Sequence, residues 1–296
     1  MFKIVQAEWL APKVRRLMVE APRVARRHQP GHFVIVRVHE EGERIPLTIA
    51  DSDAGHGTIT LIVQVVGATT ERLCGLEAGE GISNVAGPLG RPTDIEYVGH
   101  AVLVGGGVGT AVIYPQAAAL REVGNRVTAV IGGRSREYVI LEAELAQCCD
   151  DVFPCTDDGS YGYHGFVTGW LKDLIDDTGD VGLVLTAGPV PMMRAVAEVT
   201  RPHGIRTIAS LNPIMVDGTG MCGGCRVTVD GQMKFACVDG PEFDAHTVDF
   251  AGLTDRLTTY RNQEQLAWNR LHETALGDHS RGAHCQMSGL EAAAPV

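Results

Sequence analysis

The stretch HAVLVGGGVGTAVIYPQAAALREVGNRVTAVIGGR, residues 100–134, determines the fold class expected for this chain. It predicts a buried strand, a glycine turn, a helix and a second strand, which together make one βαβ unit. Glycines in such a turn let the backbone approach a pyrophosphate, and the helix N-terminus behind them offers N–H groups to it. Gly105, Gly107 and Gly109 satisfy the usual G-x-G-x-x-G pattern only in part, because Thr110 or Ala111, depending on register, stands at its last position. A purely structural βα turn is the alternative at this point.

The choice of nicotinamide nucleotide stays open in the sequence. A dinucleotide-binding turn is usually followed about 20 residues later by an acidic residue, but here the second strand ends in IGGRSRE, residues 131–137. Arg134, Ser135 and Arg136 could bind a 2′-phosphate, which favours NADP(H). Alternatively, they are solvated loop residues.

The first 96 residues have a different sequence pattern. Short β-rich runs, HFVIVRV (32–38), TITLIVQVV (58–66) and GEGISNVAGPLG (79–90), are separated by turn-forming segments such as DSDAGHG (51–57). This pattern favours an antiparallel barrel. Arginine and hydroxyl side chains in the barrel region could bind a flavin pyrophosphate, and they are Arg44, Thr48, Thr69 and Thr70.

Further along, VGLVLTAG (181–188) predicts another buried strand, with a helix behind it. The loop CTDDGSYGYHG (155–165) could close over a cofactor or lie on the surface. LTDRLTTYRNQEQLAWNRLHETAL (253–276) predicts a polar helix, either a docking helix or a capping one, before a tail that contains Cys285. The predicted domains are residues 1–96, 97–211, 212–250 and 251–296.

Three cysteines in DGTGMCGGCRVTVDGQMKFAC, residues 217–237, are the strongest chemical signal. Cys222 and Cys225 share a glycine loop, and the turn at Asp230–Gly231 predicts a hairpin that returns Cys237 to their side. A structural zinc site would add His246 as the fourth ligand, whereas a [2Fe–2S] cluster could take Asp217. Both interpretations remain open on the residues alone.

The formal charge of −11 argues against a nucleic-acid-binding role, because no basic stripe offers phosphates a counter-charge. No signal peptide and no apolar run long enough for a membrane span is visible. We therefore expect a cytoplasmic protein whose eight cysteines stay reduced, which favours metal ligation over disulfides.

The order of these motifs resembles the electron-transfer subunits of the ferredoxin reductase superfamily. These include the subunits of dihydroorotate dehydrogenase and, more similar still, of NADH-dependent ferredoxin:NADP⁺ oxidoreductase. The resemblance covers about residues 1–250 and rests on ERIPLTIAD, GGGVGTA, TDDGSYGYHGFVT, AGPVPMMRAV and DGTGMCGGCRVTV. It implies a multidomain β plus α/β fold: an antiparallel FAD-binding β-barrel, a Rossmann-like parallel-sheet NAD-binding domain and a small C-terminal [2Fe–2S] domain.

The resemblance also implies site residues. The FAD contacts would be Arg44, Pro46, Leu47, Thr48, Val63, Gln64, Val65, Thr69 and Thr70. NAD(H), or possibly NADP(H), would be bound by Gly105–Thr110 together with Arg134, Asp157, Asp158, Gly159, Gly188, Pro189 and Met192. The cluster ligands would be Asp217, Cys222, Cys225 and Cys237. Three features depart from the pattern of the wider family: the spacing from Arg44 to Thr48 is one residue longer, Ala187 replaces a cysteine, and Asp217 stands where the dihydroorotate-type subunit has a fourth cysteine ligand. The ferredoxin:NADP⁺ type resembles this chain in having one aspartate and three cysteines.

The implied activity is that of an oxidoreductase subunit in which cofactors carry the chemistry, so no catalytic acid or base is expected. Electrons would pass between NAD(H), FAD and the [2Fe–2S] cluster. A larger partner subunit with FAD and two [4Fe–4S] clusters would complete a heterodimer, reach ferredoxin and carry out electron bifurcation. The alternatives are a subunit of a dihydroorotate, sulfide or glutamate-synthase-type complex and, in another class, a zinc-stabilised binding module.

Overall fold

The computed structural model of the protein describes residues 1–284. The predicted tail, with Cys285, therefore lies outside the described residues. No helix in the described part of the chain is long and apolar enough to cross a membrane.

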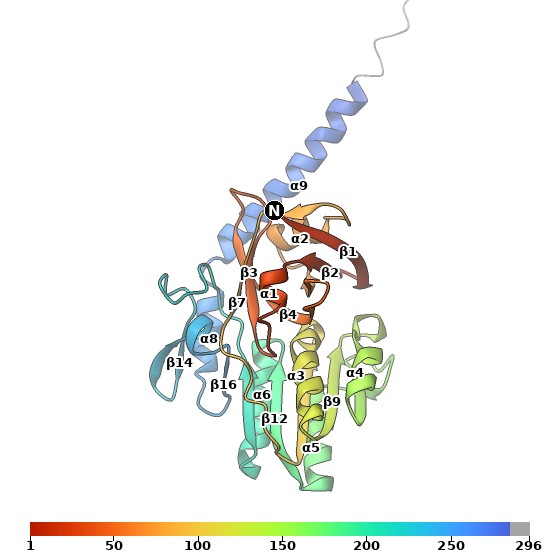
Figure 1. The fold of residues 1–296 in the computed structure, drawn as a ribbon, viewed down its shortest axis with the longest axis vertical. Helices are drawn as coiled ribbons and strands as arrows, with labels where there is room; N and C mark the ends of the chain where they lie inside the picture. The colour runs from red at the N-terminus through yellow and green to blue at the C-terminus, as the bar shows by residue number, and fades with distance from the viewer. Residues whose placement is uncertain (285–296) are drawn as a thin grey trace, which may run out of the picture.

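The N-terminal region is a seven-stranded antiparallel sheet with strand order β6-β1-β2-β5-β4-β3-β7 (Figure 1). Its strands are β1 (Phe2–Ala11), β2 (Val14–Glu20), β3 (Phe33–Arg37), β4 (Arg44–Asp53), β5 (Thr58–Gln64), β6 (Gly81–Ile82) and β7 (Asn84–Leu89). The two edge strands, β6 and β7, are separated in the chain by Ser83 alone. The sheet must therefore curl until its edges meet, which confirms the predicted barrel.

The barrel core consists of inward-facing aliphatic side chains from alternate strand positions, among them the fully buried Leu17, Ile49 and Leu61. Two short helices, α1 (Pro22–Ala25) and α2 (Ala68–Cys74), lie in the connections. Arg15, only 4% exposed, holds the end of α2: its guanidinium donates to the carbonyl of Cys74 and pairs with Glu77 at 2.7 Å.

The second sheet has the order β11-β10-β9-β8-β12-β13-β16, and all its pairings are parallel except the last. Its parallel strands are β8 (His100–Gly106), β9 (Arg126–Gly133), β10 (Asp151–Thr156), β11 (Tyr163–His164), β12 (Val181–Ala187) and β13 (Arg206–Ser210). The chain moves outward from β8 through β9 to β10 and then returns to β12 on the other side of β8. The strand order thus reverses between β8 and β12, where ligands of such sheets bind.

Helices cover both faces of this sheet (Figure 1). They are α3 (Thr110–Glu122), α4 (Glu142–Cys148), α5 (Val167–Thr178) and α6 (Val190–Thr200), with short 3-10 turns η1 (Gly107–Gly109), η2 (Arg136–Tyr138) and η3 (Arg201–His203). Strand β8 is buried along its whole length, as a central strand covered on both faces must be. The Rossmann-like part of the predicted fold class is therefore confirmed.

The cysteine-rich segment folds as a small unit beside the second sheet. It contains the hairpin β14 (Arg226–Val229) and β15 (Gln232–Phe235), then α7 (Ala236–Asp239) and β16 (Glu242–Asp244). Asp230 and Gly231 both have positive φ, +50° and +69°, as the tight turn that the sequence predicted requires. Strand β16 pairs antiparallel with β13, so this unit shares a sheet with the nucleotide-type domain.

The C-terminal helical region differs from the prediction of one helix over residues 253–276. The structure has two helices, α8 (Phe250–Leu257) and α9 (Arg261–His284), with a turn between them. Asp249 begins α8 by accepting a hydrogen bond from the Gly252 N–H at 3.0 Å. Helix α9 runs past α2, where His272 lies 3.1 Å from Glu71, and then projects away from the barrel (Figure 1).

Candidate functional site

The predicted dinucleotide turn lies at the carboxyl end of β8 and packs against the turn after β12. A side chain at Gly109 would overlap the carbonyl of Ala187, and one at Gly188 would approach the Gly106 backbone to 3.1 Å. Glycine is required at these positions because two backbones meet there. The structure therefore brings the predicted residues 105–110 and 188–192 together, at the point where the strand order reverses.

A second pair of predicted segments meets at the next strands. The backbone N–H of Asp158 donates to the carbonyl of Arg134 at 3.2 Å, which joins the ends of β9 and β10. Ser160 hydrogen-bonds the carboxylate of Asp158 and lowers its pKa. The guanidinium of Arg136 lies over the Tyr161 ring, 5.1 Å from its centroid. All these groups lie at the same carboxyl edge of the sheet as the glycine turn.

The barrel residues predicted for FAD lie on three adjoining elements: β4, the end of β5, and α2. The side chain of Arg44 has no hydrogen bond or ion pair within residues 1–284, so its guanidinium is free for a ligand. Thr69 donates to Glu43 at 2.5 Å. Thr70 accepts from the N–H groups of Val66 and Gly67, at 2.9 and 3.0 Å, and so caps its own helix.

The side chain of one of these residues lies in the barrel core. The side chain of Val63 is 1% exposed and belongs to the barrel core, so only its backbone could contact a cofactor. The carbonyl of Val63 also lies 3.7 Å from the Cys74 sulfur. The remaining members of the set, Pro46, Leu47, Thr48, Gln64 and Val65, are partly exposed.

The barrel contacts the nucleotide-type domain directly. Ala50 and Ile62 of β4 and β5 share a cluster with Val108 and Ala111 of the glycine turn and α3. The tip of the β1–β2 hairpin packs on the same cluster through Leu10 and Ala11. The strands predicted to bind FAD therefore adjoin the turn predicted to bind NAD(H).

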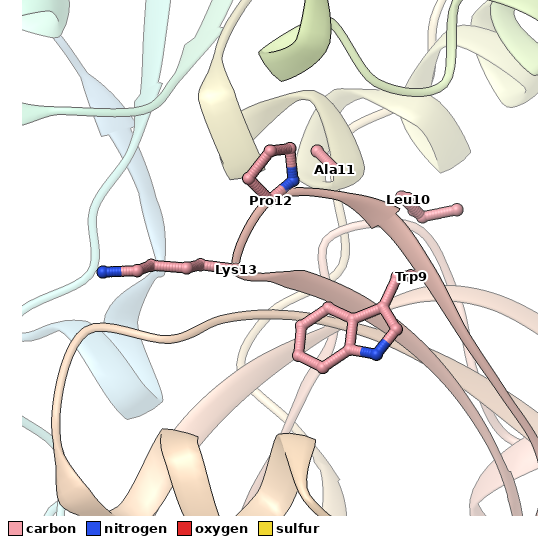
Figure 2. Close-up of a pocket in the computed structure, with 5 residues that line it drawn as sticks. All are labelled: Trp9, Leu10, Ala11, Pro12 and Lys13. Carbon is pink, nitrogen blue, oxygen red and sulfur yellow. The ribbon is translucent and has the colours of Figure 1, made fainter.

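The hairpin tip also borders a pocket of about 400 Å³, lined by Trp9, Leu10, Ala11, Pro12 and Lys13 (Figure 2). Figure 2 shows Lys13 extended away from the Trp9 ring. Lys13 has φ +63° and its carbonyl accepts from the Val65 N–H at 2.8 Å, while its ammonium has no partner within the described residues. Sequence reasoning missed this lysine, because only strand pairing places it beside the predicted flavin residue Val65.

The hairpin brings two of the predicted cluster ligands into contact. The sulfurs of Cys225 and Cys237 lie 3.2 Å apart, and burial raises the pKa of Cys237 to about 12. Cys222 is exposed, and the Gly224 N–H donates to its sulfur at 3.4 Å. The carboxylate of Asp217 accepts from the N–H groups of Thr219 (2.9 Å) and Cys222 (2.8 Å), which lower its pKa.

These donors suit an iron–sulfur centre in their chemistry. Three thiols and one ionised carboxylate come from one loop and one hairpin, and a backbone N–H points at a sulfur, as in sites that bind clusters. Within residues 1–284, no three histidine, cysteine or acidic side chains already converge as closely as metal ligands. Closing the set around a centre therefore requires movement of the Cys222 loop, which carries positive-φ glycines at 218, 220 and 223.

The zinc alternative loses its fourth ligand in this arrangement. The Nε2 atom of His246 lies 2.9 Å from the Thr200 hydroxyl of α6, and the carbonyl of His246 accepts from Arg201. The histidine is thus held at α6.

The cysteine loop also packs against the barrel. A side chain at Gly218 would meet Leu89 of β7 at 2.6 Å and Ile35 of β3 at 2.9 Å. The barrel therefore contacts the glycine turn through β4 and β5, and the cysteine loop through β3 and β7.

Comparison with known proteins identifies the family. Residues 212–249 match the model of the iron–sulfur cluster binding domain of dihydroorotate dehydrogenase B. The chain is 46% identical over 273 residues to a Thermotoga maritima protein named as a homolog of the dihydroorotate dehydrogenase B (NAD⁺) electron transfer subunit, covering 92% of this chain and 96% of the relative. The chain belongs to this family of electron-transfer subunits.

Other members extend the comparison. The electron transfer subunit of Geobacillus thermodenitrificans is 33% identical, with 83% of this chain and 96% of that protein covered. A chain of the NADH-dependent reduced ferredoxin–NADP oxidoreductase structure is 44% identical, with a TM-score of 0.87 over 91% of this chain and 97% of that chain. The resemblance and the fold class predicted from the sequence are confirmed.

As a member of this family, the chain is an electron-transfer subunit of an oxidoreductase that acts with NAD(H), flavin and iron–sulfur. FAD, NAD(P)H and a [2Fe–2S] cluster are the cofactors of this family and fold. The family name, electron transfer subunit, also implies a larger catalytic partner subunit in a multi-subunit complex. The family match at residues 212–249 favours the iron–sulfur interpretation over a zinc-stabilised module.

Proposed function

We propose that this chain is the NAD(H)-, FAD- and [2Fe–2S]-binding subunit of an electron-bifurcating NADH-dependent ferredoxin:NADP⁺ oxidoreductase. The observation that carries the proposal is the 44% identity and TM-score of 0.87 to the structure of that name, over 97% of its chain. That structure is described in terms of flavin-based electron bifurcation. The Asp217 carboxylate beside three cysteines supports the same choice, because the resemblance implies this ligand set for that subunit.

Each predicted segment has a role in this proposal. The glycine turn 105–110 and the start of α3 would hold the NAD(H) pyrophosphate with N–H groups, beside Gly188, Pro189 and Met192. The loop with Asp157–Gly159 would close on the nicotinamide side of the nucleotide, and the neighbouring loop would bring Arg134 beside it. Arg44, free of protein partners within the described residues, would bind the FAD pyrophosphate from β4.

When bound, nicotinamide and flavin supply two-electron hydride chemistry and the cluster supplies one-electron chemistry. The chain's own residues orient these groups and keep water away. The hairpin tip and the Ala50–Ala111 cluster would seal the junction between flavin and nicotinamide. Backbone N–H groups keep Asp217 ionised, as a ligand must be, and the Gly224 N–H would tune the cluster through Cys222.

The partner follows from the same proposal. A larger subunit with FAD and two [4Fe–4S] clusters would form a heterodimer with this chain and would pass electrons to ferredoxin. A cytoplasmic location and the domain limits at residues 96, 211 and 250 remain predictions.

Anaerobic absorption and EPR spectra of the purified chain, with and without NADH, test the cofactor content. Flavin bands that bleach with NADH and an S = ½ signal after dithionite are expected. A colourless protein that contains zinc would overturn the proposal.

The partner identity needs a second assay. The complex that copurifies with the tagged chain is expected to reduce ferredoxin and NAD⁺ together with NADPH as donor. The second candidate, a dihydroorotate dehydrogenase B subunit, is favoured by the names of several relatives. It predicts instead NAD⁺ reduction by dihydroorotate and no dependence on ferredoxin.

A further inference from the structure

Glu242, at the start of β16, joins three parts of the chain through one carboxylate oxygen. Its Oε1 atom accepts from the hydroxyl of Thr93 at 2.7 Å and from the amide nitrogen of Gln116 at 2.9 Å. These partners are 149 and 126 positions away in the chain. The three residues therefore form a junction that no local structure would produce.

Each member of this junction leads to one predicted cofactor segment. Gln116 is fully buried on α3, whose first residue, Thr110, closes the glycine turn. Thr93 lies in the connection that leaves the barrel after β7. Glu242 follows α7, which contains the predicted cluster ligand Cys237. The junction thus connects the nucleotide turn, the flavin barrel and the cysteine unit through the Oε1 atom of Glu242.

The surrounding backbone is shaped to admit these contacts. Gly31 has φ +88°, and a side chain there would lie 2.6 Å from the Thr93 hydroxyl and 3.2 Å from Glu242 Oε1. The Thr93 N–H donates to the Pro30 carbonyl at 2.8 Å, so Thr93 is held against the barrel. The Arg91 N–H donates to the Gly240 carbonyl at 2.7 Å, which fastens the same connection to the cysteine unit.

The polar character of the junction is costly. Burial raises the pKa of Glu242, with Asp94 nearby adding to the increase, while its two hydrogen bonds oppose it. The Oε1 atom of Gln116 is buried without a hydrogen-bond partner among the described residues. An unpaired buried polar atom destabilises the folded state, so an apolar side chain at position 116 would be more stabilising. The geometry thus favours a role in relative placement over one in stability.

We propose that Glu242 is a positioning residue that sets the separation between the flavin barrel and the cluster-binding unit. Its hydrogen bonds to Thr93 and Gln116 involve no predicted cofactor residue, and it acts through these two partners. The inference rests on the proposed function, because it assumes that FAD and the cluster occupy the segments assigned above. Its consequence is that the junction controls how fast an electron passes from flavin to cluster, and not how fast NADH reduces the flavin.

The test compares Glu242→Ala, Glu242→Gln and the control Asp244→Ala in the full chain. Asp244 is exposed on the same strand, two positions from Glu242, and its side chain hydrogen-bonds only locally, to the His246 N–H. Glu242→Gln keeps the size of the side chain and an oxygen acceptor. Hydrogen–deuterium exchange reports on the 91–96 connection whether or not cofactors are bound.

In Glu242→Ala we expect amide exchange in the 91–96 connection to rise about tenfold, because loss of one charge-assisted hydrogen bond has roughly that effect on an opening equilibrium. Anaerobic stopped-flow and freeze-quench EPR follow the two electrons that NADH gives to the flavin, one of which passes to the cluster. Flavin bleaching should keep its parental rate, while the cluster signal should appear several-fold later. Glu242→Gln should restore most of the rate, and Asp244→Ala should match the parent.

Equal cluster reduction in Glu242→Ala and the parent would overturn the proposal, as would slow reduction with unchanged exchange. If Glu242→Ala does not fold, Thr93→Val removes the Thr93–Glu242 hydrogen bond without changing side-chain size. This variant should show the same two effects, more weakly. A parent chain without flavin bands or a cluster signal would refute the proposed function instead. The exchange measurement would still decide whether Glu242 holds the three parts together.

Discussion

The thiols of Cys225 and Cys237 lie 3.2 Å apart although 12 positions separate them in the chain. The turn at Asp230–Gly231 folds β15 back on β14, and the Ala236 N–H donates to the carbonyl of Cys225 at 3.1 Å. A hairpin of this length ends where it began, so its flanking residues meet. This contact places two of the four predicted ligands at one point and leaves Cys222 and Asp217 on the adjoining loop.

Replacing Asp217 by cysteine should change the cluster without affecting the flavin. A thiolate donates more charge to iron than a carboxylate, so the reduction potential of the cluster should fall and its g-values should shift. An EPR-monitored redox titration measures both. Asp230→Asn is the matched control, since it removes a carboxylate from the hairpin turn, and asparagine tolerates the positive φ found there. Identical EPR spectra in parent and Asp217→Cys would remove Asp217 from the ligand set.

Gly109→Ala should weaken NADH binding. The added methyl would overlap the Ala187 carbonyl and push the two turns apart, at a cost of about 1–3 kcal/mol for overpacking. Fluorescence titration with NADH should show a higher Kd, with flavin content unchanged. Gly75→Ala is the control, because Gly75 has φ −78° and its added methyl would have only ordinary contacts, 3.4 Å or longer. NADH affinity equal to that of the parent would show that the turn does not bind the nucleotide.

Arg15→Met should lower both stability and FAD affinity. The substitution leaves the Cys74 carbonyl at the end of α2 without its buried donor, which costs about 1–3 kcal/mol. Because Thr69 and Thr70 lie in the first turn of α2, loosening of this helix should also release FAD. Urea denaturation and FAD titration of the apoprotein measure the two effects. Arg16→Met is the control: Arg16 is more exposed and pairs with Glu8 and Glu144 instead of α2. Parental FAD affinity in Arg15→Met would contradict the link between α2 and the flavin.

His28 should make the protein less stable in mild acid. Burial, together with His32 nearby, lowers the pKa of His28 from 6.5 to about 4 in the folded state, while its Nδ1 lies 2.8 Å from the Ser52 hydroxyl. Between these two pKa values the unfolded chain binds the extra proton, so stability falls as the pH drops from 6.5 towards 4. At pH 5 the loss should be about 1 kcal/mol after allowing for partial exposure.

The check is urea denaturation from pH 7 to pH 5 for the parent and for His28→Gln. The variant should lose less stability over that interval than the parent does. His56→Gln should not show this protection, because Asp53 raises the pKa of the exposed His56 and protonation there favours the folded state. Equal losses in the parent and His28→Gln would show that His28 does not titrate as described.

Residues close in the chain determined much of this protein. The run from His100 to Gly133 specifies its strand, turn, helix and strand because each piece has the apolar pattern of its element and the glycines mark the turn. The hairpin turn at Asp230–Gly231 needs only two residues that accept positive φ. The motif order along the chain was also enough to predict the fold class and the family.

Only the tertiary structure decided what distant residues do to one another. Local sequence patterns do not predict which distant residues come into contact. Examples are the pairing of β16 with β13, the contact of His246 with Thr200 and the inward direction of Val63. The same holds for Glu242, whose two hydrogen-bond partners come from other parts of the molecule. Such contacts form because side chains are buried together once the sheets assemble, so their energies arise only in the folded chain.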